Sequence, residues 1–215
     1  MNILNPALLA RAFAFFAYPT KMSGDKVWVS DASNIDAISG ETALGQLATL
    51  VKDKSSEATD VLSSSFGLMD SFLGFIPGSI GETSVVAILI GAAILLFTGI
   101  GSWRIIFSGF FGGFIMALIF NLWNANGFMG INPFHQLCLG GFMFGIVFMA
   151  TDPVSAAQTN KGKYIYGFLC GFLAIMIRVF NPAYPEGIML AILFMNVMAP
   201  MIDHYVIQGS VKRRL

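Results

Sequence analysis

The chain has 215 residues, of which 56% are hydrophobic and 11% charged, with twelve basic and twelve acidic side chains. A soluble domain of this length carries about 25% charged residues, so the composition predicts a membrane protein. The zero net charge gives no support for nucleic-acid binding. The two cysteines, Cys138 and Cys170, lie in separate apolar runs without the spacing of a metal or disulfide motif, and we expect both to be small buried residues.

One short apolar stretch comes first, and the only long polar region follows it. Residues 3–18 open with Asn5-Pro6 and are interrupted by Arg11. About 20 residues are needed to span a bilayer, so we expect a short N-terminal helix here. In the polar region, 19–83, we expect one possible strand and two helical segments, at residues 26–30, 42–52 and 57–73.

A turn-rich string, Ile76–Ser84, leads from the polar region into the membrane. A Gly/Pro string before a span is typical of a re-entrant or broken element, which is tolerated at membrane depth where protein or water covers it. The alternative is a loop at the membrane interface. The sequence leaves both open.

Five strongly apolar runs follow, each long enough at about 1.5 Å per residue to cross a bilayer core as a helix. They are residues 84–100, 103–123, 134–151, 164–180 and 187–207. Glycines four residues apart, such as Gly109 with Gly113 and Gly167 with Gly171, allow close approach of neighbouring helices. The predicted fold is therefore an all-α polytopic membrane protein with five strong spans and a short N-terminal helix.

Charges in the short connections predict the orientation. Basic residues occur at Arg104, at Lys161 with Lys163, and at 212–214, whereas the alternate connections 124–133 and 181–186 contain none. The positive-inside rule places the basic connections and the C-terminus in the cytoplasm, and the segment 19–83 on the opposite side. Arg178 is the exception, and we expect it to snorkel outward or to pair with Glu186.

A weak internal sequence similarity indicates an inverted repeat. Asn5-Pro6 and Asn181-Pro182 each open an apolar helix, and by the predicted topology these helices run in opposite directions. Inverted repeats of this kind build transporter folds. On this interpretation residues 1–18 are the last helix of a first repeat, 19–83 a non-cytoplasmic segment, and 84–215 a five-helix membrane domain, the second unit.

The polar segment contains a hydroxyl at Thr42, shortly after Gly40 and Ser39 and six residues after Asp36. A glycine beside a hydroxyl residue lets an enzyme or a phosphate approach the backbone closely. The alternative is purely local: Ser39 caps a short helix through Thr42, with Glu41 in its first turn.

Two carboxylates near the predicted cytoplasmic ends of spans are candidates for a cation pathway. Asp203 follows Pro200 in the last span, and Asp152 begins a cytoplasmic connection. Intramembrane carboxylates are costly and usually functional. The alternatives are an interfacial carboxylate at Asp203 and a helix-breaking turn at Asp152-Pro153. His135 and His204 have no metal-binding motif around them.

Several long blocks, in order along almost the whole chain, resemble the B subunit of the sodium-translocating NADH:quinone reductases. They are Leu9–Phe13, Ser23–Trp28, Pro77–Thr83, Ser102–Ile106, Ala150–Ala157, Pro185–Gly187 and Ile202–His204. The chain looks like the C-terminal half of that subunit.

This resemblance implies a flavoprotein of a bacterial inner membrane. In the family, the motif Asp-x-x-Ser-Gly-Ala-Thr carries FMN on its threonine through a phosphoester, installed by a flavin transferase. Asp36, Ser39, Gly40 and Thr42 match it, whereas Glu41 stands where the family has alanine. A carboxylate there would repel the incoming phosphate, by about 4 kcal/mol at 4 Å before screening.

The implied function is electron transfer from NADH through partner subunits to this FMN, then to riboflavin and quinone, coupled to Na⁺ export. A close alternative is the D subunit of the Rnf electron-transport complex, which shares the flavin motif. A channel for a small solute, of the urea-channel type, is the alternative from another class. It would need no flavin acceptor.

Overall fold

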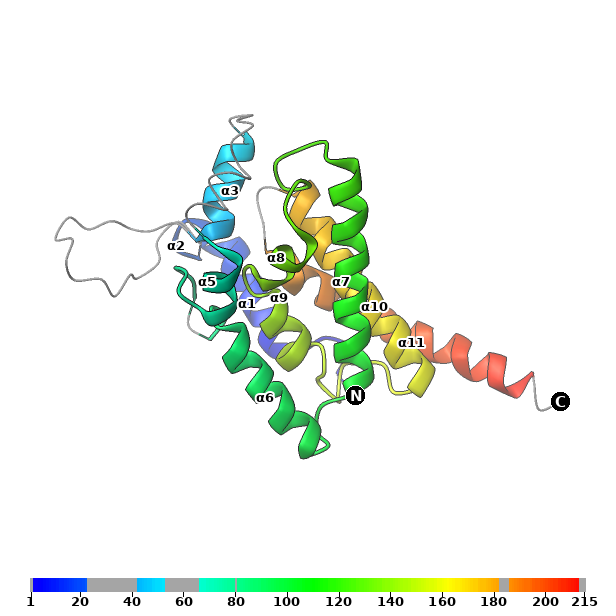
Figure 1. Cartoon of the computed structure of the whole chain (residues 1–215). Coiled ribbons are helices and arrows are strands. Elements are labelled where there is room, and N and C mark those ends of the chain that lie inside the picture. Colours follow the sequence, from blue (N-terminus) through cyan, green and yellow to red (C-terminus); the bar gives the residue numbers. More distant parts are fainter. Residues whose placement is uncertain (1, 23–41, 53–65, 80, 182–185, 213–215) are drawn as a thin grey trace.

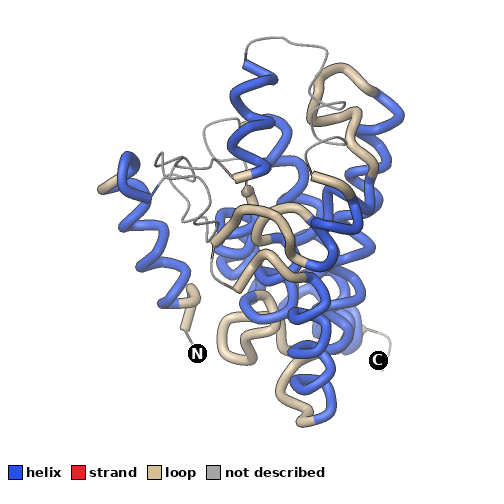
Figure 2. Tube along the Cα trace, turned by 60° about the vertical axis from the view of Figure 1, so that its left-hand side comes forward, coloured by secondary structure: helices blue, strands red, loops and turns tan. Residues whose placement is uncertain are grey.

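The computed structural model describes residues 2–22, 42–52, 66–79, 81–181 and 186–212. In these residues all regular structure is helical (Figure 2). The helices before the first long span are α1 Pro6–Ala17, α2 Pro19–Met22, α3 Ala43–Lys52, α5 Leu68–Leu73 and α6 Val85–Phe97. Those that follow are α7 Trp103–Trp123, α8 Pro133–Cys138, α9 Phe142–Phe144, the π-helix η1 Gly145–Met149, α10 Asn160–Phe180 and α11 Ile188–Val211. The strand expected at 26–30 lies outside the described residues.

Three of the five expected spans are single helices long and apolar enough to cross a membrane: α7, α10 and α11, of 21, 21 and 24 residues. The prediction of five continuous spans is otherwise corrected. The run 84–100 forms α6, which has 13 residues and ends before Gly99, a glycine with φ of 73°. The run 134–151 is broken into α8, α9 and η1. Mean hydropathy does not reveal such interruptions of a helix, because a glycine hardly changes the mean hydropathy of a run but allows non-helical backbone angles.

Helices α7 and α10 lie side by side and run in the same direction. Their starts meet where Trp103 and Tyr164 make an edge-to-face contact of 5.8 Å, and their ends meet at Phe120 and Phe180, 5.5 Å apart. Between these ends, glycines bring the backbones together: a Cβ on Gly171 would overlap the carbonyl of Gly109. The predicted role of these glycines in helix packing is confirmed.

Helix α11 runs antiparallel to α10, because Asp203, near its C-terminal end, contacts Thr159 at the start of α10. The starts of α7 and α10 and the end of α11 therefore share one end of the molecule. Of the basic residues predicted to be cytoplasmic, the described ones lie there: Arg104, Lys161, Lys163 and Lys212. The last turns of α11 extend beyond the other helices (Figure 1).

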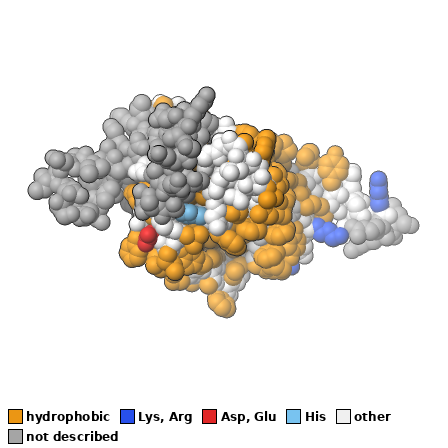
Figure 3. Space-filling view, turned by 45° about the horizontal axis from the view of Figure 1, so that its top comes forward, with side chains coloured by type: hydrophobic (Ala, Val, Ile, Leu, Met, Phe, Trp, Pro, Cys, Tyr) orange, Lys and Arg blue, Asp and Glu red, His pale blue; other side chains and the backbone are white. Residues whose placement is uncertain are grey.

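The short N-terminal helix is confirmed as α1. Asn5 caps it, since its Oδ1 accepts hydrogen bonds from the N–H groups of Ala7 and Leu8, and Pro6 occupies the first helical position. Contacts with α11 hold α1 against the membrane helices. Apolar side chains cover much of the described surface, as expected for a chain surrounded by lipid or by other membrane subunits (Figure 3).

Candidate functional site

Thr42 is the N-cap of α3. Its Oγ1 accepts a hydrogen bond from Gly45 N at 3.1 Å, and its carbonyl accepts one from Gln46 N at 3.0 Å. One alternative places Thr42 inside a helix capped by Ser39; in the structure the helix begins at Ala43, and Thr42 itself closes its first turn. Asp36, Ser39, Gly40 and Glu41 lie outside the described residues.

The helix that follows Thr42 is anchored by its apolar face. Ala43, Leu44, Leu47 and Ala48 are buried. Leu44 packs so closely on Gly140 that a Cβ on this glycine would overlap its Cδ1. Gly140 also has a φ of 62°, in the left-handed region that favours glycine. Thr42 thus lies at the start of a helix that packs on the connection between α8 and α9.

That connection is held together by a buried arginine. Arg178, on α10, is 1% exposed, and its guanidinium donates to the carbonyls of Gln136 and, at 3.0 Å, Leu139. Where a helix is interrupted inside a membrane protein, backbone carbonyls lose their helical hydrogen-bond donors. Here the Arg178 side chain donates hydrogen bonds to two such carbonyls. The expectation that Arg178 snorkels outward is therefore wrong.

Two carboxylates accompany this arginine. Glu82 and Glu186 act on Arg178 electrostatically, and a carboxylate oxygen of each lies within 4 Å of the point that a Cβ on Gly141 would occupy. The expected pairing of Arg178 with Glu186 is therefore supported by this electrostatic interaction, and Glu186 also forms an ion pair with Arg11, at 3.4 Å.

Glu82 is also buried and accepts a hydrogen bond from Ser79 N at 3.1 Å. The turn-rich lead-in is thus folded against the α8–α9 break. For the string Ile76–Ser84, these contacts favour an element covered by protein over a loop at the membrane interface.

Asp203 joins α11 to the start of α10. Its carboxylate accepts from Gln158 N at 2.7 Å, from Thr159 N at 3.0 Å and from the Thr159 hydroxyl at 2.6 Å. It therefore stabilises the N-terminal end of α10, where a negative charge is favoured. A sodium role for Asp203 stays a prediction, and a passing cation would compete with these donors.

Asp152 lies three residues after the end of the π-helix and is hydrogen bonded to Ser155 Oγ at 2.7 Å and to Asn5 Nδ2 at 3.4 Å. It thus links the turn after η1 to the start of α1, which agrees with the expected turn at Asp152-Pro153. Its place in a sodium pathway also stays a prediction. Asp152 lies in the connection after η1 and Asp203 lies within α11, and no hydrogen bond joins them in the described part of the chain.

Neither histidine belongs to a candidate metal centre. His135 Nε2 is hydrogen bonded to Ser71 Oγ at 3.1 Å, and His204 Nε2 to Gln208 at 2.9 Å. Within the ranges that the structure covers, no three His, Cys, Asp or Glu side chains are grouped to hold a metal ion.

The described residues fit the phosphate of an FMN at Thr42. The first turn of a helix carries N–H groups without intrahelical partners, and phosphate binds well there. Helix α3 has 10 residues, and its first turn begins directly after Thr42. A phosphoester on Thr42 Oγ1 would place negatively charged oxygens at this end of the helix.

Sequence reasoning missed the buried polar contacts of α10. It expected Arg178 at a membrane surface and did not single out Tyr166, whose hydroxyl donates to Asn196 Oδ1 at 2.7 Å. Polar side chains inside apolar spans were the available signal, because such residues usually face other helices.

The fold and these contacts define a helical, multi-pass membrane protein. The family model described as "NQR2, RnfD, RnfE family" matches residues 1–212, and the chain belongs to this family. The whole chain is 51% identical to the B subunit of the Na(+)-translocating NADH-quinone reductase of Chromohalobacter salexigens, and 50% identical to that of Stutzerimonas stutzeri. It covers 50% and 51% of these relatives, and so spans about half of their length.

Proposed function

We propose that the chain is a membrane subunit of a Na⁺-translocating NADH:quinone oxidoreductase and carries FMN covalently on Thr42. In this role it relays electrons from partner subunits towards quinone, and the transfer is coupled to Na⁺ export across a bacterial inner membrane. The full subunit would also hold riboflavin.

The observation that carries the proposal is the position of Thr42 at the N-terminus of α3, in a chain about 50% identical to the B subunit of such reductases. The hydroxyl lies where the helix end stabilises an attached phosphate. Leu44 and Gly140 fix this helix end against the membrane helices.

The isoalloxazine of a bound FMN would supply the electron chemistry, and the protein would supply its position. The covalent tether keeps the flavin at a high local concentration near its redox partners. Anchoring of α3 on the α8–α9 break limits how far the tether can move.

The direct test is flavinylation. Co-expressed with a flavin transferase, the full chain should gain the mass of one FMN less one water, and the denatured polypeptide should fluoresce on a gel. Thr42→Ala should abolish both signals, because no hydroxyl remains at the helix end.

Two neighbouring substitutions serve as controls. Ser39→Ala removes a hydroxyl in the wrong register and should leave at least part of the flavin. Glu41→Ala removes the nearby carboxylate and should raise occupancy if repulsion of the phosphate limits the transfer. If neither the native chain nor Glu41→Ala gained flavin, the assignment as an electron carrier would be withdrawn.

The proposed orientation has its own test. Cysteines introduced at Ser56 and Ser210, in a chain without Cys138 and Cys170, should differ in labelling by an impermeant reagent on spheroplasts. Position 56 should react and position 210 should be protected, because short-loop basic charge stays in the cytoplasm. The reverse pattern would invert the topology.

The D subunit of the Rnf complex remains the alternative, because the matching family description includes RnfD. The two roles differ in partners, so the subunits that copurify with the tagged chain decide between them. A solute channel would be supported instead by transport without any covalent flavin.

A further inference from the structure

The contact between α10 and α11 buries two polar side chains in the middle of long apolar helices. Tyr166 on α10 and Asn196 on α11 are 0% and 1% exposed, and the tyrosine hydroxyl donates to Asn196 Oδ1 at 2.7 Å. Neither residue belongs to the turns and helix ends described above. Buried polar groups are costly unless they are fully hydrogen bonded.

The pair is not fully hydrogen bonded. Asn196 Nδ2 is buried and has no partner among the described residues. Pro200 lies four residues further along the same helix and has no N–H, so the main-chain carbonyl of Asn196 loses its usual donor. A side-chain amide without a partner and a carbonyl without its usual helical donor thus occur at one residue, next to a tyrosine oxygen. A ligand is the simplest way to satisfy them.

The charges around this place favour a cation over an anion. The Tyr166 hydroxyl is affected first by its burial, then by Cys170 and last by the negative charge of Asp152. On α11, Asp203 lies two helical turns from Asn196, which is about 10 Å at 1.5 Å per residue. Thr159, at the start of α10, lies the same distance along the chain from Tyr166. Among the described residues, the hydrogen bonds of Asp152, Asp203 and the Tyr166–Asn196 pair involve no basic side chain, although Lys161 lines the cavity at the end of this interface. Two carboxylates near a buried site would repel an anion and stabilise a cation.

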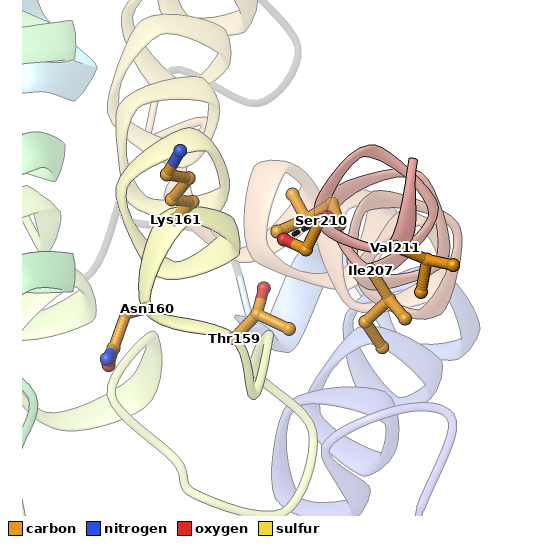
Figure 4. Close-up of a pocket in the computed structure, with 7 residues that line it drawn as sticks. Thr159, Asn160, Lys161, Ile207, Ser210 and Val211 are labelled. Carbon is orange, nitrogen blue, oxygen red and sulfur yellow. Dashed lines mark hydrogen bonds between the residues drawn. The ribbon is translucent and has the colours of Figure 1, made fainter. Parts of the chain in front are cut away.

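A cavity opens on this side of the molecule, at the shared end of α10 and α11. It has a volume of about 350 Å³, and Thr159 faces Ile207 and Val211 across it (Figure 4). Thr159 also donates to Asp203, so the cavity adjoins the first polar contact along the α10–α11 interface. The second polar contact along this interface is the Tyr166–Asn196 pair.

We propose that Asn196 and Tyr166 form an inner binding site for Na⁺ between α10 and α11. The ligands are Asn196 Oδ1, the Asn196 main-chain carbonyl and the Tyr166 hydroxyl oxygen. Small hard cations prefer such oxygen ligands, and carbonyls released where a helix is interrupted coordinate ions in many transporters.

Ion binding involves rotation of one amide. A half-turn of the Asn196 side chain exchanges its oxygen and nitrogen, so that Nδ2 donates to the tyrosine oxygen and Oδ1 faces the ion. In the structure the tyrosine hydroxyl donates to Asn196 Oδ1. The site rests on the proposed function in one respect, namely that the transported ion is Na⁺.

The test measures Na⁺ binding without electron transfer. The full chain in detergent is unfolded thermally over a series of NaCl concentrations, with choline chloride keeping the ionic strength constant. A bound ion stabilises the native state by mass action, so Tm should rise with Na⁺. Asn196→Leu should raise the Na⁺ concentration needed for half of this effect by about tenfold or more.

Two milder substitutions keep the test decisive if Asn196→Leu does not fold. Asn196→Asp has nearly the same shape and adds a negative charge, and it should lower the half-maximal Na⁺ concentration about tenfold. Tyr166→Phe removes one ligand and should raise that concentration severalfold. Tyr164→Phe is the matched control on the same helix, because Tyr164 packs on Trp103 instead.

The proposal is overturned if Na⁺ does not raise Tm, or if the Na⁺ dependence is the same in Asn196→Asp and Tyr166→Phe as in the native chain. The pair would then hold a structural water only. Failure of flavinylation at Thr42 would remove the proposed function and leave this result unaffected, since the binding assay needs no flavin.

Discussion

Helix α10 contacts its neighbours in two different ways. Against α7 it presents aromatic rings at the two ends and glycines in the middle, where the two backbones approach closely. Against α8 and α11 it presents Arg178, Tyr166 and Thr159, which make hydrogen bonds to carbonyl, amide and carboxylate groups. One helix thus combines an apolar, close-packed contact with contacts built on buried polar groups.

The two kinds of contact have different roles: the glycine contact packs helices together, whereas the polar contacts hold irregular backbone or a ligand. In lipid, helices associate through close van der Waals contact of small residues, and the α7–α10 contact needs nothing more. Polar groups in the same surroundings add cost and are kept where they hold an irregular backbone or a ligand. The polar contacts of α10 coincide with the α8–α9 break, the Asp203 cap and the Tyr166–Asn196 pair.

Arg178→Met should have the largest effect on this comparison. It leaves two buried carbonyls without donors and removes the positive charge beside Glu82 and Glu186, at a cost of about 3–5 kcal/mol. Tm in detergent should fall steeply. Arg178→Lys should recover only part of the loss, because an ammonium group cannot reproduce the planar fork. A native Tm in Arg178→Met would show that the break is held by other contacts.

Gly171→Ala tests the apolar contact. The added methyl would overlap the Gly109 carbonyl, and forcing the backbones apart should cost about 1–3 kcal/mol. Thermal unfolding of the purified chain measures this loss. Gly209→Ala is the matched control, because no atom lies within 4 Å of its new methyl group. Equal Tm values for the two variants would contradict the close contact.

Asp203→Asn has a smaller expected cost, about 1–2 kcal/mol, because the amide oxygen can still accept two of the three hydrogen bonds. If Asp203 also captures sodium, the substitution should weaken Na⁺ stimulation of quinone reduction in the assembled complex and leave the covalent flavin unchanged. An unaltered apparent Na⁺ affinity there would leave Asp203 with only its role at the start of α10.

Tyr166→Phe should have the smallest effect on stability, below about 1 kcal/mol, as is usual for single hydrogen bonds between membrane helices. Its effect on Na⁺ binding should be much larger than its effect on Tm without Na⁺. This contrast distinguishes a ligand from a structural hydrogen bond. A large loss of Tm in choline chloride would assign the hydroxyl to packing.

The candidate site was predictable in part. The spacing of Asp36, Ser39 and Gly40 singled out Thr42 in the sequence, and the structure adds that Thr42 caps α3. The packing of α3 on Gly140 could not be predicted, because the two residues in contact, Leu44 and Gly140, are far apart in the chain. A contact of this kind leaves no periodic signal.

The amino-acid sequence alone specified the class of protein, the three long helices and the end of the molecule where basic charge gathers. Hydropathy, helix length and loop charge are summed along the chain, so they can be read without knowing which residues meet. Contacts between distant segments decided where the run 134–151 breaks and what holds it. Arg178 reaches carbonyls 39 and 42 residues away, and the free energy of burying it depends on those partners alone.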